Sequence, residues 1–113
     1  MYHITFNPQS NRASWIGFGQ LVDVDDNPID ITGCSMVLEV ADSQDAPRLQ
    51  ASTANGKITY PDVGVFRWAF TRDEMRGLGP GTYKTGLTIT NDDGTQTTQL
   101  SVGPLPIVDG VVP

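Results

Sequence analysis

Apolar and polar residues alternate along most of this chain, and this repeat of two residues is the feature that most restricts its fold. In "CSMVLEV" (residues 34–40) every second side chain is apolar, and "GVFRWAF" (residues 64–70) repeats the arrangement with aromatic residues. Such alternation is typical of β-strands that bury one face and expose the other. Helical periodicity is nearly absent, so the chain is predicted to be almost entirely β.

Further alternating segments bring the expected total to about seven short strands. Glycines and prolines are scattered between them, which suits strands joined by turns. The stretch "NDDG" (residues 91–94) is a strong hairpin signal between the last two strands. The other five strands are expected at residues 1–6, 15–22, 56–60, 82–89 and 95–102, counting the two that flank this hairpin.

One short helical turn is predicted at "TRDEM" (residues 71–75), because Thr71 and Glu74 have the spacing of a capping box. The next strand begins near Gly81 and Tyr83. In immunoglobulin-like domains a tyrosine at this place turns its hydroxyl back onto the backbone of the preceding corner, and Thr85 stands where antibody domains have a cysteine. We therefore predict a single immunoglobulin-like antiparallel β-sandwich.

Length and charge limit the classes of protein to which this chain can belong. It has 113 residues, the size of one domain, with 38% hydrophobic and 18% charged residues. Thirteen acidic and seven basic residues give a net charge of −6. Nucleic acid is not expected as a partner, because phosphate binding needs clustered Lys and Arg.

The ends and the cysteine count bear on localisation. The start "MYHITFNPQS" has no basic region and no apolar run, and no stretch approaches the length of a membrane span. Cys34 is the only cysteine, so an internal disulfide cannot form. Synthesis in a cytoplasm is expected, without secretion by a signal peptide and without a membrane partner.

The acidic stretch "DVDDNPID" (residues 23–30) invites a test for calcium, which prefers carboxylate oxygens. As an EF-hand loop beginning at Asp23 it has Pro28 where glycine is needed and Cys34 where a bidentate glutamate is needed. Asp and Asn also stabilise turns by local hydrogen bonds. We predict a solvated turn with no metal and no other cofactor. Its four aspartates are Asp23, Asp25, Asp26 and Asp30.

No catalytic residue is predicted. His3 is the only histidine and lies at the N-terminus, where a Ser-His-Asp arrangement has little support. Cys34 alternates with apolar neighbours and is expected to be a buried, inert thiol. Glu39 and Glu74 are the carboxylates best suited to glycoside hydrolysis. Their positions, on an outward strand face and in a capping box, already explain them, so the chain is not expected to be an enzyme.

The remaining ligands to consider are sugars, which tryptophans can bind, and nucleotides, which need a glycine-rich loop. Trp15 and Trp68 can stack on sugars, which keeps a carbohydrate-binding module as an alternative, although large aromatic residues in a sandwich are usually part of the core. No glycine-rich loop stands between a strand and a helix, so a nucleotide site is not predicted.

The stretch "DDNPIDITGCSMVLEVAD" (residues 25–42) resembles a "D-G-x-P-hydrophobic-D-L-T-G" signature of small immunoglobulin-like proteins of tailed bacteriophages and prophages. The resemblance continues through the glycine-aromatic strand, the "T-x-x-E-M" turn, the "G-x-Y" strand, the "D-G" hairpin and the hydrophobic ending. The N-terminal domain of phage upper baseplate proteins is similar in pattern. Ile31 stands where leucine is commoner, and the ending "GPLPIVDGVVP" is longer than usual.

This resemblance implies a structural role in a virion, in the tail, the baseplate or the attachment of fibres. A head-decorating protein of the same fold is the alternative. The implied partners are other virion proteins and copies of the same chain, and the implied place of synthesis is the cytoplasm of a bacterial host.

The motif "PIDITG" (residues 28–33) is predicted to be a structural corner that sets the register of the following strand. Asp30 and Thr32 can hydrogen-bond to nearby backbone, and Gly33 permits a positive φ. Ile29 and Ile31 are expected to attach this corner to the core.

Residues 104–113 are predicted to form an extended apolar arm, separate from a sandwich of residues 1–103. Pro104 and Pro106 lack the amide hydrogens that a central strand needs. The arm is expected to dock on a neighbouring subunit, and the alternative is an edge strand of its own sandwich. The side chains proposed for docking are Leu105, Ile107, Val108, Val111 and Val112.

Overall fold

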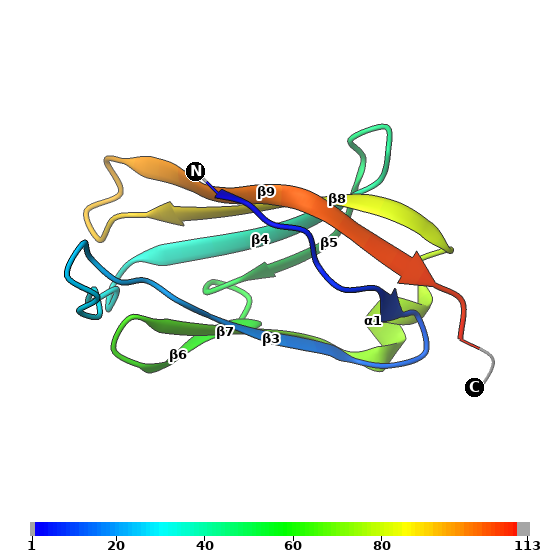
Figure 1. The fold of residues 1–113 in the computed structure, drawn as a ribbon, viewed down its shortest axis with the longest axis horizontal. Coiled ribbons are helices and arrows are strands. Elements are labelled where there is room, and N and C mark those ends of the chain that lie inside the picture. The colour runs from blue at the N-terminus through cyan, green and yellow to red at the C-terminus, as the bar shows by residue number, and fades with distance from the viewer. Residues whose placement is uncertain (1, 111–113) are drawn as a thin grey trace.

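Two β-sheets packed face to face form the protein, as the computed structural model shows for residues 2–110 (Figure 1). The larger sheet has the order β1-β9-β8-β4-β5, with β2 also paired to β9, and the smaller sheet has the order β3-β7-β6. The strands are β1 Tyr2–His3, β2 Gln9–Ser10, β3 Trp15–Gln20, β4 Ser35–Ala41, β5 Pro47–Ser52, β6 Ile58–Asp62, β7 Val65–Phe70, β8 Gly81–Thr90 and β9 Thr97–Val108.

This topology confirms the predicted immunoglobulin-like sandwich. In the immunoglobulin scheme, β3, β7 and β6 correspond to strands B, E and D, and β4, β8 and β9 correspond to C, F and G. The described chain has nine strands where about seven were predicted. The polar strand β5 and the two-residue β2 carry no clear alternation, so the sequence pattern did not reveal them.

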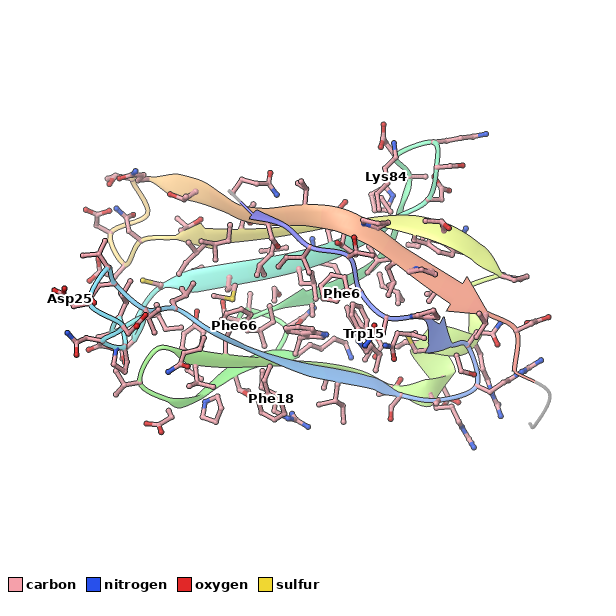
Figure 2. All side chains as sticks on the ribbon, in the orientation of Figure 1. Phe6, Trp15, Phe18, Asp25, Phe66 and Lys84 are labelled. Carbon is pink, nitrogen blue, oxygen red and sulfur yellow. The ribbon has the colours of Figure 1, made fainter. Side chains whose placement is uncertain are left out.

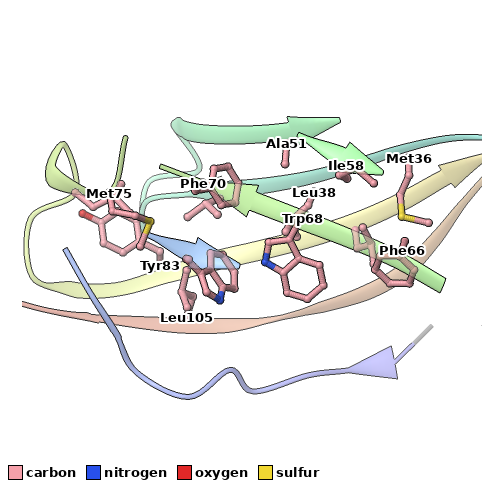
Figure 3. Packing of buried hydrophobic residues seen from close by; sticks show 14 of the residues in the cluster. Met36, Leu38, Ala51, Ile58, Phe66, Trp68, Phe70, Met75, Tyr83 and Leu105 are labelled. Atoms are coloured by element: carbon pink, nitrogen blue, oxygen red, sulfur yellow. The ribbon is translucent and has the colours of Figure 1, made fainter. Parts of the chain in front are cut away.

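The core lies between the sheets and follows the predicted alternation. Met36, Leu38 and Val40 point inward from β4, and the three aromatic residues of β7 point inward from the facing sheet (Figure 3). Burying each such side chain contributes about 1.5–3 kcal/mol, so these two strands supply much of the free energy of folding. The aromatic residues of β7 are Phe66, Trp68 and Phe70.

The helical turn and the tyrosine corner lie where they were predicted. Helix α1 (Arg72–Arg76) is capped by Thr71, whose side chain accepts from the Glu74 amide while the Glu74 side chain accepts from the Thr71 amide. Tyr83 is buried, and its hydroxyl donates to the carbonyl of Gly79 at 2.9 Å. Gly81 has φ 147°, which favours glycine at this corner. Within residues 2–110 no helix is long and apolar enough to cross a membrane.

The prediction of a separate C-terminal arm is wrong for residues 104–108, which lie in strand β9. Strand β9 continues through residues 104–108 and pairs with β8 from Thr97 to Ile107, with one register shift, so the sandwich does not end at Gly103. Leu105 and Ile107 are buried in the core and cannot dock on a neighbour, and Val108 is half exposed. Val111 and Val112 lie outside the described residues.

Pro104 and Pro106 fit in β9 because the neighbouring N-terminal segment donates hydrogen bonds to this strand. The N-terminal segment (residues 2–10) runs along the side of β9 away from β8, where the Ile4 and Phe6 amides donate to the carbonyls of Val102 and Pro104. On this side β9 accepts hydrogen bonds, which a proline can do. Residues 104–108 therefore belong to the chain's own sandwich, as the alternative held, but in a strand paired on both sides and not in an edge strand.

Candidate functional site

Strand β3 is an open edge of the smaller sheet, because it pairs with β7 and with no other strand of the described chain. The Leu21 amide donates to the Gly64 carbonyl at 2.8 Å and continues the β3–β7 ladder. Backbone groups alternate between the two sides of a strand. Those of Ile16, Phe18 and Gln20 therefore point away from β7, and within residues 2–110 they have no hydrogen-bond partner.

The other sheet edges carry features that discourage pairing with another chain. Strand β5 begins with Pro47 and Arg48, and β6 contains Pro61 beside a register shift. At its other edge the larger sheet ends with the N-terminal segment, which covers the free side of β9 and forms the two-residue strands β1 and β2, too short to pair well with another chain. Strand β3, with the sequence WIGFGQ, has no proline and no charged residue, so it is the edge that remains able to accept a further strand.

An apolar groove of about 180 Å³ lies beside this edge, between β3 and the N-terminal segment. Its floor comes from the core and its two walls from the two sheets, and Ser101 is the polar residue among those that line it. Figure 2 shows Phe6 and Phe66 between the sheets. The lining residues are Ile4, Phe6, Phe18, Gly19, Leu38, Phe66, Trp68, Leu87 and Ser101.

The outer face of β3 is also apolar. Ile16 is 48% exposed and Phe18 is 63% exposed. Phe18 points away from the sandwich (Figure 2), and the Arg67 guanidinium lies 6.0 Å from the centre of its ring. A strand added to β3 would meet apolar side chains on this face and the groove on the other.

The inner face of β3 is shaped by glycine and aromatic residues. A Cβ at Gly17 would lie 2.1 Å from the Trp68 ring, and a Cβ at Gly19 would lie 2.1 Å from the Phe66 ring. Trp15 and Trp68 are both buried, which fits the expected core role rather than a sugar platform. The Trp68 Nε1–H is buried without a hydrogen-bond partner in the described chain, and Trp15 packs edge-on against its ring.

The predicted corner at residues 28–33 is present in most of its details. The Thr32 amide donates to Asp30 Oδ1 at 2.9 Å, and the hydrogen bonds from the Thr32 side chain and backbone lower the pKa of Asp30. Gly33 has φ 86°. Ile31 is buried, whereas Ile29 is 42% exposed, so Ile31 alone attaches the corner to the core.

The acidic stretch forms a hydrogen-bonded turn. Asp23 Oδ1 accepts from the amides of Asp25 at 2.9 Å and Asn27 at 3.0 Å, and Asp26 has φ 63°. These contacts account for the aspartates as turn residues. Within residues 2–110 no group of three or more His, Cys, Asp and Glu is arranged to hold a metal ion.

The other candidate residues are dispersed. Cys34 is half-buried and not fully buried as expected, because it precedes β4 at the end of the sandwich. Glu39 lies on the outward face of β4. Glu74 contacts Lys57 and caps α1, and the side chain of His3 is outside the described part. The structure brings none of these described side chains together into one site.

Sequence reasoning missed the open edge of β3. Residues 15–22 are apolar on both faces of the predicted strand, which is typical of a central or sheet-switching strand. Its neutral, proline-free sequence was the available signal, but whether a strand lies at an edge depends on where the rest of the chain pairs.

The chain was compared with family models, curated proteins and solved structures. Neither a family model nor a curated protein matches the chain. Among solved structures, CopC from Methylosinus trichosporium OB3b aligns with a TM-score of 0.46 and 10% identity, covering 98% of this chain and 88% of that one. At this level of similarity, nothing that CopC binds is transferred to this chain.

These findings correct the expected virion role. The solved structure named above is CopC and not a phage protein, and neither a family model nor a curated protein connects this chain to a virion. Residues 104–108 of the arm that was expected to join neighbours in a particle are part of the chain's own sandwich. Short motifs such as "D-I-T-G" and "D-D-G" form corners and turns in the structure, so they predict the fold and not the role of the protein.

Proposed function

We propose that this protein is a non-catalytic interaction module that binds an extended segment of a protein chain by adding it as a strand to β3. The observation that carries the proposal is the open edge: Ile16, Phe18 and Gln20 present three N–H donors and three carbonyl acceptors without partners in the described chain. Strand addition to an exposed sheet edge is a recurrent mode of peptide recognition.

The surroundings of the edge define the chemistry of the bound segment. Main-chain hydrogen bonds hold it about 4.8 Å from β3, and its side chains point alternately to the two faces. On one face they meet Ile16 and Phe18, and on the other they meet the apolar groove. The segment is therefore extended, free of proline at the pairing positions, and apolar.

Several observations support a role without catalysis. The Glu74 carboxylate already accepts from the Thr71 amide and from Lys57. The Asp30 carboxylate accepts from the Thr32 amide, and Asp23 accepts from two amides in its turn. These carboxylates each have a structural function.

A displayed library of peptides of about ten residues, the upper length of a common strand, tests the proposal. The selected peptides are measured against the wild type, Gln20→Pro and Gln20→Ala. Proline removes an amide that points away from β7, so β3 keeps its ladder while the open edge loses a donor. We expect binding to be kept by Gln20→Ala and lost by Gln20→Pro. Equal binding by both variants, or no selected peptide, would contradict strand addition.

Amide hydrogen exchange gives a second measurement. In the free monomer, the amides of Ile16, Phe18 and Gln20 should exchange fast, while those of Gly17 and Gly19, which face β7, should be protected. A bound peptide should slow the exchange of the Ile16, Phe18 and Gln20 amides. Protection that appears instead on β5 or β6 would place the binding edge elsewhere.

A further inference from the structure

We infer that the strand that pairs with β3 is β3 of a second copy of this chain, antiparallel to the first, around a two-fold axis at Phe18. This inference rests on the proposed function and names its partner. Two copies paired in this way form a continuous six-strand sheet from two three-stranded ones. The edge of each copy is then covered by the other, as expected of an isologous interface.

The positions of the free backbone groups select the register. Ile16, Phe18 and Gln20 all point outward, and an antiparallel pairing centred on Phe18 sets Phe18 opposite Phe18 and Ile16 opposite Gln20. Every free donor and acceptor of the three residues then has a partner. A pairing centred on Gly17 would leave Gln20 without a partner on β3 of the second copy.

The same register brings opposite charges together. Arg12 lies six residues before Phe18, and Val24 lies six residues after it, between Asp23 and Asp25. Both lie in turns beyond the ends of β3, so the antiparallel arrangement directs the Arg12 end of each copy toward the acidic turn of the other. Arg12 forms no ion pair within residues 2–110, although its Nε donates to the Gly110 carbonyl at 3.4 Å, and Asp25 is exposed. The charges favour antiparallel over parallel pairing, in which like ends would meet.

The side chains at the centre fit this arrangement on both faces. On the outer face Phe18 meets Phe18 of the second copy, and aromatic cross-strand pairs stabilise sheets. On the inner face Gly17 lies opposite Gly19 of the second copy, and the Trp68 and Phe66 rings of each copy fill the space beside these glycines. Ile4, which is 38% exposed, lines the groove beside this edge.

Sedimentation velocity of the full chain between about 1 µM and 1 mM tests the association. We expect a monomer–dimer equilibrium in the wild type and in Gln20→Ala, and a monomer throughout in Gln20→Pro. A wild type that stays monomeric at the highest concentration overturns the inference. If the peptides of the previous section still bind, the proposed function stands alone; if they do not, both fail.

Cysteine cross-linking tests the register on a Cys34→Ser background, which removes the native thiol. Opposed Cα atoms of a hydrogen-bonded antiparallel pair lie about 5.5 Å apart, within the range of a disulfide. We expect Phe18→Cys to give a covalent dimer on oxidation. Gln20→Cys is the matched control, because its two copies lie several residues apart, and it should not cross-link. Cross-linking of Gln20→Cys instead would overturn the register.

A charge exchange tests the orientation. Arg12→Glu and Asp25→Arg should each weaken the dimer, and the double variant should restore it. Each dimer has two such exposed contacts, so each single change should raise the dissociation constant about 2- to 30-fold. Added salt should weaken the wild-type dimer in the same direction. A double variant that is weaker than both single ones would overturn the antiparallel arrangement.

Discussion

Gly17 lies directly against the indole ring of Trp68, its partner across the β3–β7 ladder: a Cβ at position 17 would stand 2.1 Å from Trp68 Cζ2. The missing side chain on β3 makes the space into which the ring folds. The glycine therefore contributes to packing of the core, although it lies on an edge strand.

Gly17→Ala should destabilise the protein by about 1–3 kcal/mol, because the buried ring must move out of its position. Urea denaturation measures the change. Gly79→Ala is the matched control, since a Cβ there meets nothing within 4 Å and the position has no positive φ. Equal stability of the two variants would show that the Trp68 ring adapts freely.

Leu105→Ala should cost about 2–5 kcal/mol, as expected for a large aliphatic side chain removed from a packed core. Leu105 is 0% exposed, whereas Val108 at the end of the same strand is 48% exposed. Val108→Ala should change the free energy of unfolding much less. If truncation after Gly103 left a folded protein with an unchanged melting temperature, residues 104–108 would not belong to the sandwich.

Tyr83→Phe should lower the free energy of unfolding by about 0.5–1.5 kcal/mol, the net contribution of a typical hydrogen bond. The variant keeps the buried ring and removes the hydroxyl that donates to Gly79. Denaturation curves should keep their slope and shift their midpoint. A variant as stable as the wild type would mean that water satisfies the Gly79 carbonyl equally well.

Acid should destabilise the protein partly through Glu74. Burial raises the pKa of this carboxyl, but hydrogen bonds from Lys57 and Thr71 outweigh it and hold the pKa below the ordinary value of 4.5. A depressed folded-state pKa stabilises the fold above the unfolded-state value, and this contribution is lost as pH falls through the folded-state pKa. The wild type should therefore lose stability below about pH 4.5.

The Glu74→Gln variant should lose less free energy of unfolding over the same pH interval, because the glutamine amide does not titrate. Urea denaturation from neutral pH to about pH 3 compares the two proteins. Parallel curves would show that other carboxylates account for the acid sensitivity; Asp30, Asp42 and Asp93 also have lowered pKa values.

Removal of calcium should leave the melting temperature unchanged. The Asp23 carboxylate is hydrogen-bonded to the amides of Asp25 and Asn27, which stabilises the turn without a cation. Thermal unfolding with excess chelator and with excess calcium measures this. A decrease of several degrees with chelator would contradict the turn interpretation.

Local sequence was sufficient for several elements of this structure. The alternation in residues 34–40 predicts which side chains of β4 are buried, because side-chain direction in a strand reverses at every residue. The capping box of α1 and the corner at Asp30 are also predictable, since their hydrogen bonds join residues two or three positions apart. The Tyr83–Gly79 bond spans four residues.

Only the tertiary structure decided which strand edges are covered. Pro104 and Pro106 predict the start of a separate arm, yet they lie in β9. They fit there because the N-terminal segment, about a hundred residues earlier in the chain, donates hydrogen bonds to that strand. The same segment pairs with β9 and not with β3, and this leaves β3 open. A strand's own sequence determines its faces, whereas its edges depend on segments that are distant along the chain and meet it only in the folded state.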